Sequence, residues 1–422
     1  MKNIVIYEDI SEPWFSPLDQ LRAVFEIKAG MFSFLERIFL LYPESRHHLF
    51  YRDNLKGVVR KRYPAFFHNT LNVGLDVLFI NGRVVVDNKL KNEISNIEEE
   101  FLLLNGDKVI CFRLKGNKVA SFVEEGIKQK FSDKYVLNYF RQTQGYIIKN
   151  IVAKRFENIW QIISDNGEMI RLDFEIVDKG GLVLSRVETH TALTNEKDIY
   201  IGKHSTISPF VHIDATKGPV YIGRGVEIKS NVLIEGPVFI DNGAKIYPGY
   251  IRENTSIGEN CRVGGEVEGS IFLANSNKYH AGFVGHSYVG EWVNFGAMAT
   301  TSDLKNNYKE IILDLGEEEV ASGTRLIGSI IGDHCKFGIG TMINSGTIFG
   351  VAVNVVGSNF KLPKRVSAFS WIVDGSRDVF LFDKFIETAK VVVSRRNKEL
   401  SPEEISLFEQ LYSKLRLVIK KN

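Results

Sequence analysis

The densest group of side chains that could carry out chemistry spans residues 275–283, with the sequence Asn-Ser-Asn-Lys-Tyr-His-Ala-Gly-Phe. His280 is followed there by two small residues, which would leave room for a substrate beside its ring. A neutral imidazole is the usual general base near pH 7 and could take a proton from an attacking amine or hydroxyl, for a gain of about 10²–10⁴-fold in rate. We therefore expect His280 to be a catalytic base. A surface or structural role is the alternative, and it suits His204, His212 and His334.

Amide side chains follow this histidine along the chain. Asn294 is fourteen residues further on, and Asn306, Asn307 and Tyr308 come next as a polar group. These side chains could bind the hydroxyls of a sugar, and Lys278 is a further candidate for a phosphate. The alternative is that the asparagines only build turns, which is their usual role.

A nucleotide site near the N-terminus is harder to place. The chain has neither the phosphate loop G-x-x-x-x-G-K-[ST] nor a G-x-G-x-x-G after its first apolar run. The candidate group is Arg22 with Glu26 and Gly30. A guanidinium can pair with a phosphate, although an ordinary surface arginine is the alternative.

A six-residue period dominates the chain from about residue 199 to 360. The period predicts a coil of stacked turns, because each six-residue stretch supplies one inward aliphatic side chain and neighbouring coils must stack to bury them. An α-helix does not explain it, since six residues correspond to 600° of rotation. The recurring apolar residues are Ile201, Ile207, Ile213, Ile222, Ile228, Ile234, Ile240, Ile246, Ile257, Val263, Ile331, Phe337, Ile343, Phe349 and Val355.

The period breaks between about 303 and 325, so we expect residues 303–314 and 316–324 to leave the coil as a loop. Loops inserted into such a coil tend to lie at the binding face. The tail is predicted to be helical over about 377–421, because residues 382–396 have helical apolar spacing. Ser401-Pro402-Glu403-Glu404 reads as a capping box with proline at the first helical position.

The first third of the chain reads as mixed α/β. We expect strands at 3–7, 77–80 and 109–114, a turn at Asn81-Gly82, and a helix over 119–130. Residues 21–42 have helix-like spacing, although Gly30 interrupts them. A linker is expected from about 145 to 198, with a helix at 156–163 and a strand at 182–190.

The overall composition is that of a soluble globular protein. Net charge is +2, which gives no electrostatic case for nucleic acid or an anionic membrane. No apolar run reaches the roughly 18 residues of a membrane helix. Cys111, Cys261 and Cys335 lie far apart, so we expect reduced, buried thiols in a cytoplasmic protein.

Several segments resemble one known family. Residues 275–308 are closely similar to its acyltransferase half, residues 17–30 match its pattern P-L-x-x-x-R-x-x-x-E-x-x-x-G, and residues 78–83 match a strand that ends in Asn-Gly-Arg. Residues 263–267 and 340–344 match the coil, and Arg395-Arg396 matches the tail. The chain thus resembles the alternative, Bacteroidetes-type form of the bifunctional UDP-N-acetylglucosamine diphosphorylase / glucosamine-1-phosphate N-acetyltransferase family.

The resemblance implies specific roles. His280 falls on the family's catalytic histidine, which deprotonates the amine of glucosamine 1-phosphate for attack on acetyl-CoA. Asn307-Tyr308 fall on its substrate-contacting pair, and Glu266 and Asn81 become candidates for substrate and nucleotide. The chain departs from the better-known form at Phe283, which stands for a tyrosine.

Two further departures bear on substrate and metal. Met298-Ala299-Thr300 replaces a more polar triplet, which bears on the sugar that is accepted. Arg83 stands near the family's metal-binding aspartate, so no metal ligand is assigned.

The expected architecture has three parts. Residues 1–198 would form a nucleotidyltransferase-like α/β domain with its linker, 199–375 a left-handed parallel β-helix that acts as acyltransferase, and 376–422 a helical tail.

The expected function is acetyl transfer from acetyl-CoA to an amino sugar 1-phosphate, coupled to uridylyl transfer from UTP with Mg²⁺, in a cytoplasmic homotrimer that supplies cell-envelope precursors. The alternatives are a sugar-1-phosphate nucleotidyltransferase whose coil serves only oligomerisation or sugar sensing, and a scaffold trimer without chemistry.

Overall fold

The computed structural model describes residues 3–9, 15–71, 76–357 and 360–419, with side chains up to residue 414. Its contacts divide the chain into two compact units. The first comprises Met1–Phe15, Leu21–Ile27 and Phe32–Asn158, and the second comprises Ser16–Gln20, Lys28–Met31 and Ile159–Asn422. The domain boundaries at 198/199 and 375/376 remain proposals.

The first unit is built on a seven-stranded sheet in the order β5-β4-β1-β6-β8-β7-β9. Strands β5, β4, β1 and β6 are parallel, and β8 runs antiparallel to both β6 and β7. The strands are β1 (Asn3–Tyr7), β3 (Phe32–Ser33), β4 (Arg46–Phe50), β5 (Phe67–His68), β6 (Asp76–Asn81), β7 (Phe101–Asn105), β8 (Lys108–Lys115) and β9 (Ile147–Asn150). The helices are α1 (Phe34–Leu41), α2 (Lys56–Arg62), α3 (Asn88–Ser95), α4 (Lys118–Lys128) and α5 (Asp133–Gln142).

The strands predicted at 3–7, 77–80 and 109–114 and the helix predicted at 119–130 are confirmed. The helix-like reading of residues 21–42 is wrong as one element, because only α1 is an α-helix. Gly30 has φ +76°, a left-handed conformation that no helix continues through. Ser33 then caps α1: its side chain accepts a hydrogen bond from the Glu36 amide, and the Glu36 carboxylate accepts one from the Ser33 amide.

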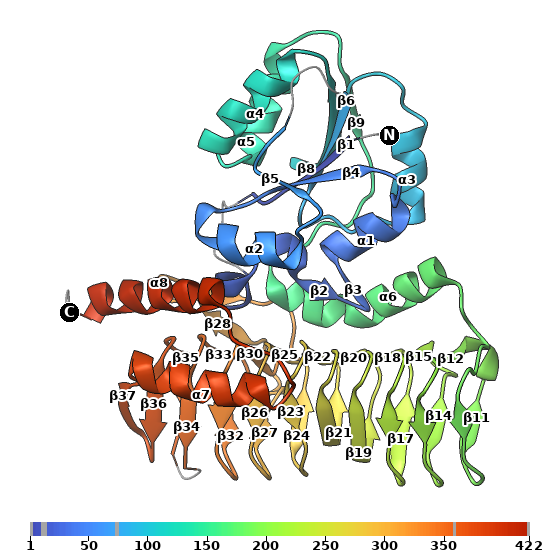
Figure 1. The fold of residues 1–422 in the computed structure, drawn as a ribbon, viewed down its shortest axis with the longest axis vertical. Coiled ribbons are helices and arrows are strands. Elements are labelled where there is room, and N and C mark those ends of the chain that lie inside the picture. The colour runs from blue at the N-terminus through green and yellow to red at the C-terminus, as the bar shows by residue number, and fades with distance from the viewer. Residues whose placement is uncertain (1–2, 10–14, 72–75, 358–359, 420–422) are drawn as a thin grey trace. The chain divides into compact units, whose positions relative to one another are not determined.

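The second unit contains a parallel β-helix with three faces, seen as a stack of short strands in Figure 1. One face is a nine-stranded sheet: β12 (Ile199–Ile201), β15 (Val220–Ile222), β18 (Val238–Ile240), β20 (Thr255–Ile257), β22 (Ile271–Phe272), β25 (Tyr288–Val289), β30 (Ser329–Ile331), β33 (Thr347–Phe349) and β35 (Arg365–Val366). The next face holds β10 (Arg186–Val187), β13 (Thr206–Ile207), β16 (Glu227–Ile228), β19 (Lys245–Ile251), β21 (Arg262–Glu268), β23 (Asn277–Lys278), β26 (Asn294–Phe295), β31 (Lys336–Phe337), β34 (Asn354–Val356), β36 (Ser370–Val373) and β37 (Ser376–Val379).

The third face begins with β11 (Ala192–Thr194), β14 (His212–Asp214) and β17 (Val232–Glu235), continues through the second halves of β19 and β21, and ends with β24 (Phe283–Gly285), β27 (Thr300–Thr301) and β32 (Met342–Ile343). All fifteen residues of the six-residue period lie in one buried core along this coil. The predicted β-helix is therefore confirmed, while its left-handedness stays a prediction.

Two expectations for the linker are corrected. The helix expected at 156–163 is α6 (Ile159–Val177), which is longer and packs against β18, β20 and the short strand β2 (Lys28–Ala29). Of the strand expected at 182–190, only β10 forms. Asn166 explains why α6 is fixed in place: its Oδ1 accepts from the Gly30 amide at 2.7 Å, and its Nδ2 donates to the Asn254 carbonyl at 2.8 Å.

The predicted excursion between 303 and 325 is confirmed, because the coil resumes only when β30 pairs with β25. It contains an antiparallel hairpin that the sequence did not reveal, β28 (Ile312–Asp314) with β29 (Glu319–Ala321).

The helical tail is also confirmed as α7 (Phe382–Ser394) and α8 (Pro402–Ile419). Ser401 forms the predicted capping box, since its amide donates to the Glu404 carboxylate at 2.9 Å and its hydroxyl accepts from the Glu404 amide at 3.3 Å. The three cysteines are free and buried, as expected. Within the described ranges, no helix is both long enough and apolar enough to span a bilayer.

Candidate active site

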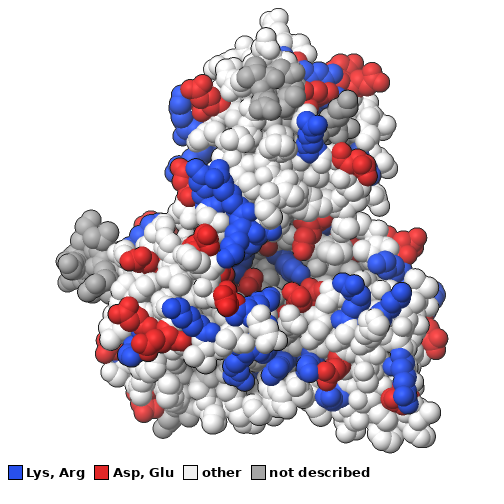
Figure 2. All heavy atoms as spheres, viewed as in Figure 1, with Lys and Arg blue, Asp and Glu red and all other residues white. Residues whose placement is uncertain are grey.

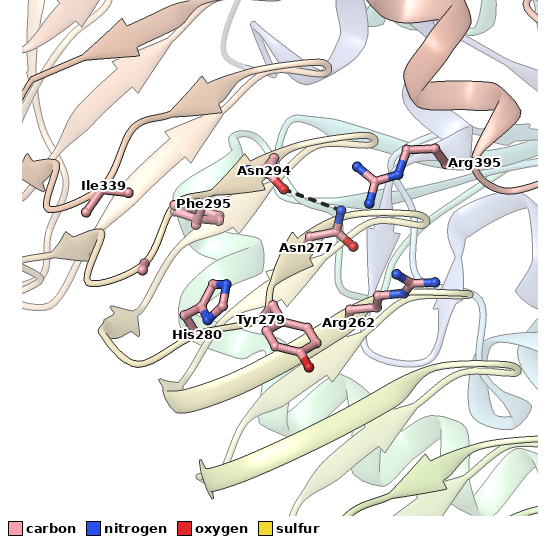
Figure 3. A pocket seen from close by; sticks show the side chains of 10 residues that line it. Arg262, Asn277, Tyr279, His280, Asn294, Phe295, Ile339 and Arg395 are labelled. Atoms are coloured by element: carbon pink, nitrogen blue, oxygen red, sulfur yellow. Dashed lines mark hydrogen bonds between the residues drawn. The ribbon is translucent and has the colours of Figure 1, made fainter.

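A pocket of about 430 Å³ lies on the coil beside His280 (Figure 3). Its walls come from successive coils and from the end of α7, so residues far apart in sequence meet there. It is lined by Arg262, Asn277, Tyr279, His280, Asn294, Phe295, Gly296, Ala297, Ile339 and Arg395. The structure therefore brings together two of the predicted site residues, His280 and Asn294.

His280 is exposed and lies at the corner of the coil that follows β23. Its ring packs edge-on against Tyr279 with 4.8 Å between ring centroids, and Tyr279 in turn packs on Tyr247 at 3.9 Å. Among the described residues, no side chain or backbone group hydrogen-bonds to the imidazole. The ring is thus supported by an aromatic neighbour while its nitrogens face the pocket, as a general base requires.

The two small residues after His280 have a backbone explanation. Gly282 has φ +124°, and a Cβ there would lie 2.4 Å from the Ala299 carbonyl oxygen of the next coil. Close stacking of the coils therefore demands glycine at this position, independently of the space that a substrate would need.

Lys278 is buried beneath the pocket. Only 1% of its surface is exposed, and its Nζ donates to the carbonyl of Gly264 at 2.9 Å and to the carbonyl of His280 at 2.6 Å. Burial lowers the pKa of this amine to about 8. A role for Lys278 as a direct phosphate ligand is not supported by this geometry, because the amine points into the protein.

Asn294 belongs to a chain of polar contacts. Its Oδ1 accepts from Asn277 Nδ2 at 3.5 Å, and Asn277 Oδ1 accepts from Arg396 Nη2 at 2.8 Å. Arg396 follows α7, so these hydrogen bonds join the helical tail to the coil.

Two guanidinium groups line the pocket, Arg262 from β21 and Arg395 directly after α7, and a third, that of Arg396, adjoins it through its hydrogen bond to Asn277. Burial lowers the pKa of Arg396, and the positive charges of Arg262 and Arg395 lower it further. Among the described residues, no carboxylate pairs with any of the three. Basic side chains also gather along part of the coil surface in Figure 2. Uncompensated guanidinium groups favour an anionic ligand, and phosphate suits their geometry.

The sequence did not lead us to predict these arginines as site residues. Arg395-Arg396 had appeared only as part of a resemblance, and Arg262 was not singled out. The available signal was that Arg262 sits one residue before the inward Val263, on an outward position of the repeat.

The polar group predicted after Asn294 lies at two other pockets. Asn306 and Asn307 line a smaller pocket of about 280 Å³, together with Lys305, while Tyr308 lines a third pocket at the inserted segment. None of the three lines the pocket of His280.

Glu266 also lies apart from the pocket of His280. It is on the second half of β21, where it pairs with Arg252 at 3.4 Å. These four residues remain proposals for substrate binding.

A histidine outside the predictions has a catalytic-type partner. His286 Nδ1 lies 2.8 Å from Asp303 Oδ2, and both side chains are mostly buried. The carbonyl of Asp303 accepts from the Ile327 amide, and the carbonyl of His286 accepts from the Gly328 amide. The pair therefore sits where the chain leaves and re-enters the coil, and it ties the two ends of the excursion together.

The nucleotide-site candidates are divided between the units. Arg22, Glu26 and Asn81 belong to the first unit, whereas Gly30 belongs to the second. Glu26 is occupied locally, since its carboxylate accepts from the Ala23 amide at 2.7 Å and from Arg62 at 3.0 Å. Arg22 is buried, with 3% of its surface exposed.

Asn81 joins a buried cluster at the end of β1. Asp9 Oδ2 accepts from Asn81 at 2.8 Å, Arg83 at 2.7 Å and Arg155 at 3.0 Å. Arginines therefore hold the carboxylate that ends this strand, and no group of three potential ligands for a metal occurs in the part of the chain that the structure describes. These residues do not fit a divalent cation.

Comparison with known proteins shows what the chain is similar to. Residues 4–181 match the model of a family described as sugar nucleotidyl transferase. "Bifunctional protein GlmU" of Methanococcus aeolicus is 31% identical over 167 residues, which are 35% of this chain and 40% of that protein. The protein of that name from Methanococcus maripaludis strain S2 is 25% identical over 374 residues, 80% of this chain and 86% of its own length.

A "Bifunctional sugar-1-phosphate nucleotidylyltransferase/acetyltransferase" of Sulfurisphaera tokodaii is 36% identical over 142 residues, 33% of this chain and 35% of that protein. The alignments at more than 30% identity thus span less than half of these relatives, whereas the one at 25% spans most of the protein. Residues 4–181 are therefore similar to the sugar nucleotidyl transferase family, and most of the chain is similar at lower identity to a protein described as bifunctional.

Proposed function

We propose that the pocket of His280 transfers an acetyl group from acetyl-CoA to the amine of an amino sugar 1-phosphate, glucosamine 1-phosphate being the substrate we favour. The observation that carries this proposal is the imidazole of His280 beside three guanidinium groups, where the part of the chain that the structure describes offers no hydrogen bond to the imidazole and no carboxylate to the guanidinium groups. An acyl transfer needs a base for the attacking amine and a site for an anionic donor, and this pocket offers both.

The reaction follows from the position of the ring. The amine attacks the thioester carbonyl, so a C–N bond forms as the C–S bond breaks and the thiol leaves. His280 takes the proton that the nitrogen loses and can return it to the departing sulfur. Asn294 is placed to orient the sugar through its amide, on the same wall as the ring.

The two halves of the pocket suit the two ends of an acyl-CoA. Ile339 gives an apolar surface for the acyl arm, because 76% of its own surface is exposed. Arg262, Arg395 and Arg396 would hold the phosphates, because guanidinium groups bind phosphate oxygens in pairs.

The exposed side chains of Ile339, Met298 and Met342 support a homotrimer in which neighbouring coils complete the groove. In such an assembly Asn306, Asn307 and Tyr308 would reach substrate from an adjacent coil. Glu266 remains a substrate contact in this proposal.

The first unit would carry the second activity, uridylyl transfer from UTP to the acetylated sugar phosphate. The match of residues 4–181 to the sugar nucleotidyl transferase family supports this half. The alternative, nucleotidyl transfer with a coil that only oligomerises or senses sugar, is favoured by the same match.

Ligand binding and turnover separate these alternatives. Acetyl-CoA should raise the unfolding temperature of the full chain, by the equivalent of about 2.7 kcal/mol at 100 times its dissociation constant. Loss of that shift in Arg262→Ala, with the response to UTP kept, would support acyl transfer in this pocket. Pyrophosphate release from UTP without any response to acetyl-CoA would favour the alternative.

A further inference from the structure

Lys278 interrupts a column of inward apolar side chains in the coil. Its partner in the neighbouring coil is Val263, and Phe295 follows at the equivalent position of β26. Both neighbours lie in the hydrophobic core, as do Ile246 and Phe337 further along the same column. An ammonium group at a core position is costly unless it is well hydrogen-bonded, so packing alone does not account for the lysine.

The amine of Lys278 finds its partners in the backbone around His280. Its Nζ donates to the His280 carbonyl at 2.6 Å and to the Gly264 carbonyl at 2.9 Å. Gly265 has φ +69°, and a Cβ there would lie 2.8 Å from this Nζ and 3.0 Å from the His280 oxygen. The amine therefore fills a tight space between two coils and fixes the corner from which the imidazole projects.

We propose that Lys278 is a positioning residue, which holds the backbone of His280 so that its imidazole reaches the attacking amine. This inference rests on the proposed acetyl transfer and goes beyond it, since it names the group that orients the base. Lys278 does not touch substrate. It acts through the carbonyl of His280, and a misplacement of about 1 Å at a reacting group can cost 10²-fold in rate.

The chain offers a matched control in Lys336. Its Nζ also donates to two backbone carbonyls, those of Trp292 at 2.5 Å and His334 at 3.3 Å. Burial lowers the pKa of each amine to about 8. Lys336 thus has similar chemistry on β31 of the same face, but it does not contact the His280 corner.

The test compares Lys278→Met with Lys336→Met in the full chain. Methionine keeps most of the length of the side chain and removes the donor. We expect Lys278→Met to lower kcat for acetyl transfer about 10²-fold with KM for acetyl-CoA within threefold of wild type, whereas Lys336→Met keeps kcat within threefold. A kcat of Lys278→Met equal to that of Lys336→Met would overturn the positioning role.

A second measurement does not depend on turnover. The imidazole of His280, assigned by its loss in His280→Ala, can be followed by NMR. We expect Lys278→Met to shift its resonances, and Lys336→Met to leave them unchanged. An unshifted His280 signal in folded Lys278→Met would contradict the proposal even if the protein proved to have another activity. If wild type lacks acetyl transfer but the signal shifts, the proposed function fails and the positioning stands.

A milder variant covers the case in which Lys278→Met does not fold. Lys278→Gln keeps one donor group, but its nitrogen is one bond closer to the backbone and cannot reach both carbonyls. We expect kcat to fall about tenfold and the His280 signal to shift in the same direction. Wild-type kcat and an unchanged signal in Lys278→Gln would rule the proposal out.

Discussion

Arg396 Nη2 lies 2.8 Å from Asn277 Oδ1, and this hydrogen bond joins the segment that follows α7 to strand β23 of the coil. Asn277 lines the pocket of His280, so the tail is a part of the candidate site. The geometry of the pocket therefore depends on how the tail docks.

The first prediction concerns the arginines that the tail supplies. Arg396→Ala removes both a guanidinium group and the partner of Asn277, so KM for acetyl-CoA should rise at least tenfold, which corresponds to about 1.4 kcal/mol. Steady-state kinetics at two salt concentrations measure it, and the salt dependence of KM should weaken in the variant. Arg224→Ala, at an exposed arginine of the same coil, is the control and should match wild type.

The second prediction concerns the capping box of α8. Ser401→Ala removes the hydroxyl that accepts from the Glu404 amide, and the loss of such a cap costs about 1 kcal/mol. The unfolding temperature should fall by a few degrees in calorimetry. Ser394→Ala, which changes an exposed serine at the end of α7, should have little effect; an equal loss in both would argue against the cap.

The third prediction is a pH dependence set by His334. Burial lowers the pKa of this imidazole well below 6.5, and its ring contacts Trp292, Phe385 and Phe408. The folded state thus keeps the ring neutral, and the unfolded state binds a proton below pH 6.5. The stability that His334 contributes is present above pH 6.5 and is lost as the pH falls below it, by up to about 1.4 kcal/mol per pH unit.

The His334→Phe variant measures that contribution. Its unfolding free energy should fall less steeply than that of wild type between pH 6.5 and 5, because the titrating ring is gone. His47 remains a source of acid sensitivity, since burial lowers its pKa to about 4. The exposed His204 provides a control, and His204→Gln should follow the wild-type curve.

The fourth prediction concerns the pair His286 and Asp303. Asp303→Ala removes the carboxylate that anchors the ends of the 303–327 excursion, and a buried hydrogen bond of this kind contributes about 1 kcal/mol. The excursion should become more sensitive to limited proteolysis, with cleavage mapped by mass spectrometry. Glu317→Ala, at an exposed acid within the same segment, should not change the cleavage rate.

Much of the second unit could be predicted because the six-residue period is a direct consequence of its geometry. Ile207, Ile228 and Ile246 are inward at successive coils, and no other arrangement buries side chains at that spacing. The tail could also be predicted, because Ser401 and Glu404 form a capping-box pattern that marks the start of a helix.

Only part of the candidate site around His280 could be predicted from the sequence. His280 stood out by residue type and by its small neighbours, but its arginine partners come from β21 and from α7, more than 100 residues apart. Their meeting depends on tertiary packing, which no local pattern records. Lys278 was predicted to bind phosphate because a lysine near a histidine suggests a ligand. Only the pairing of the neighbouring coils shows that its side chain points inward.

In the first third of the chain, the strands could be predicted but the turns could not. Residues 21–42 have helical spacing, yet the left-handed conformation of Gly30 breaks the element. A tertiary contact with Asn166 on α6, invisible in the local sequence, holds that glycine in place.

The most direct test of the account is the release of free thiol from acetyl-CoA by the purified full chain. We expect release that requires an amino sugar 1-phosphate in wild type, and at least a 10²-fold lower rate in a folded His280→Ala variant. Thiol release that is unchanged in His280→Ala would contradict the assignment of this imidazole as the base.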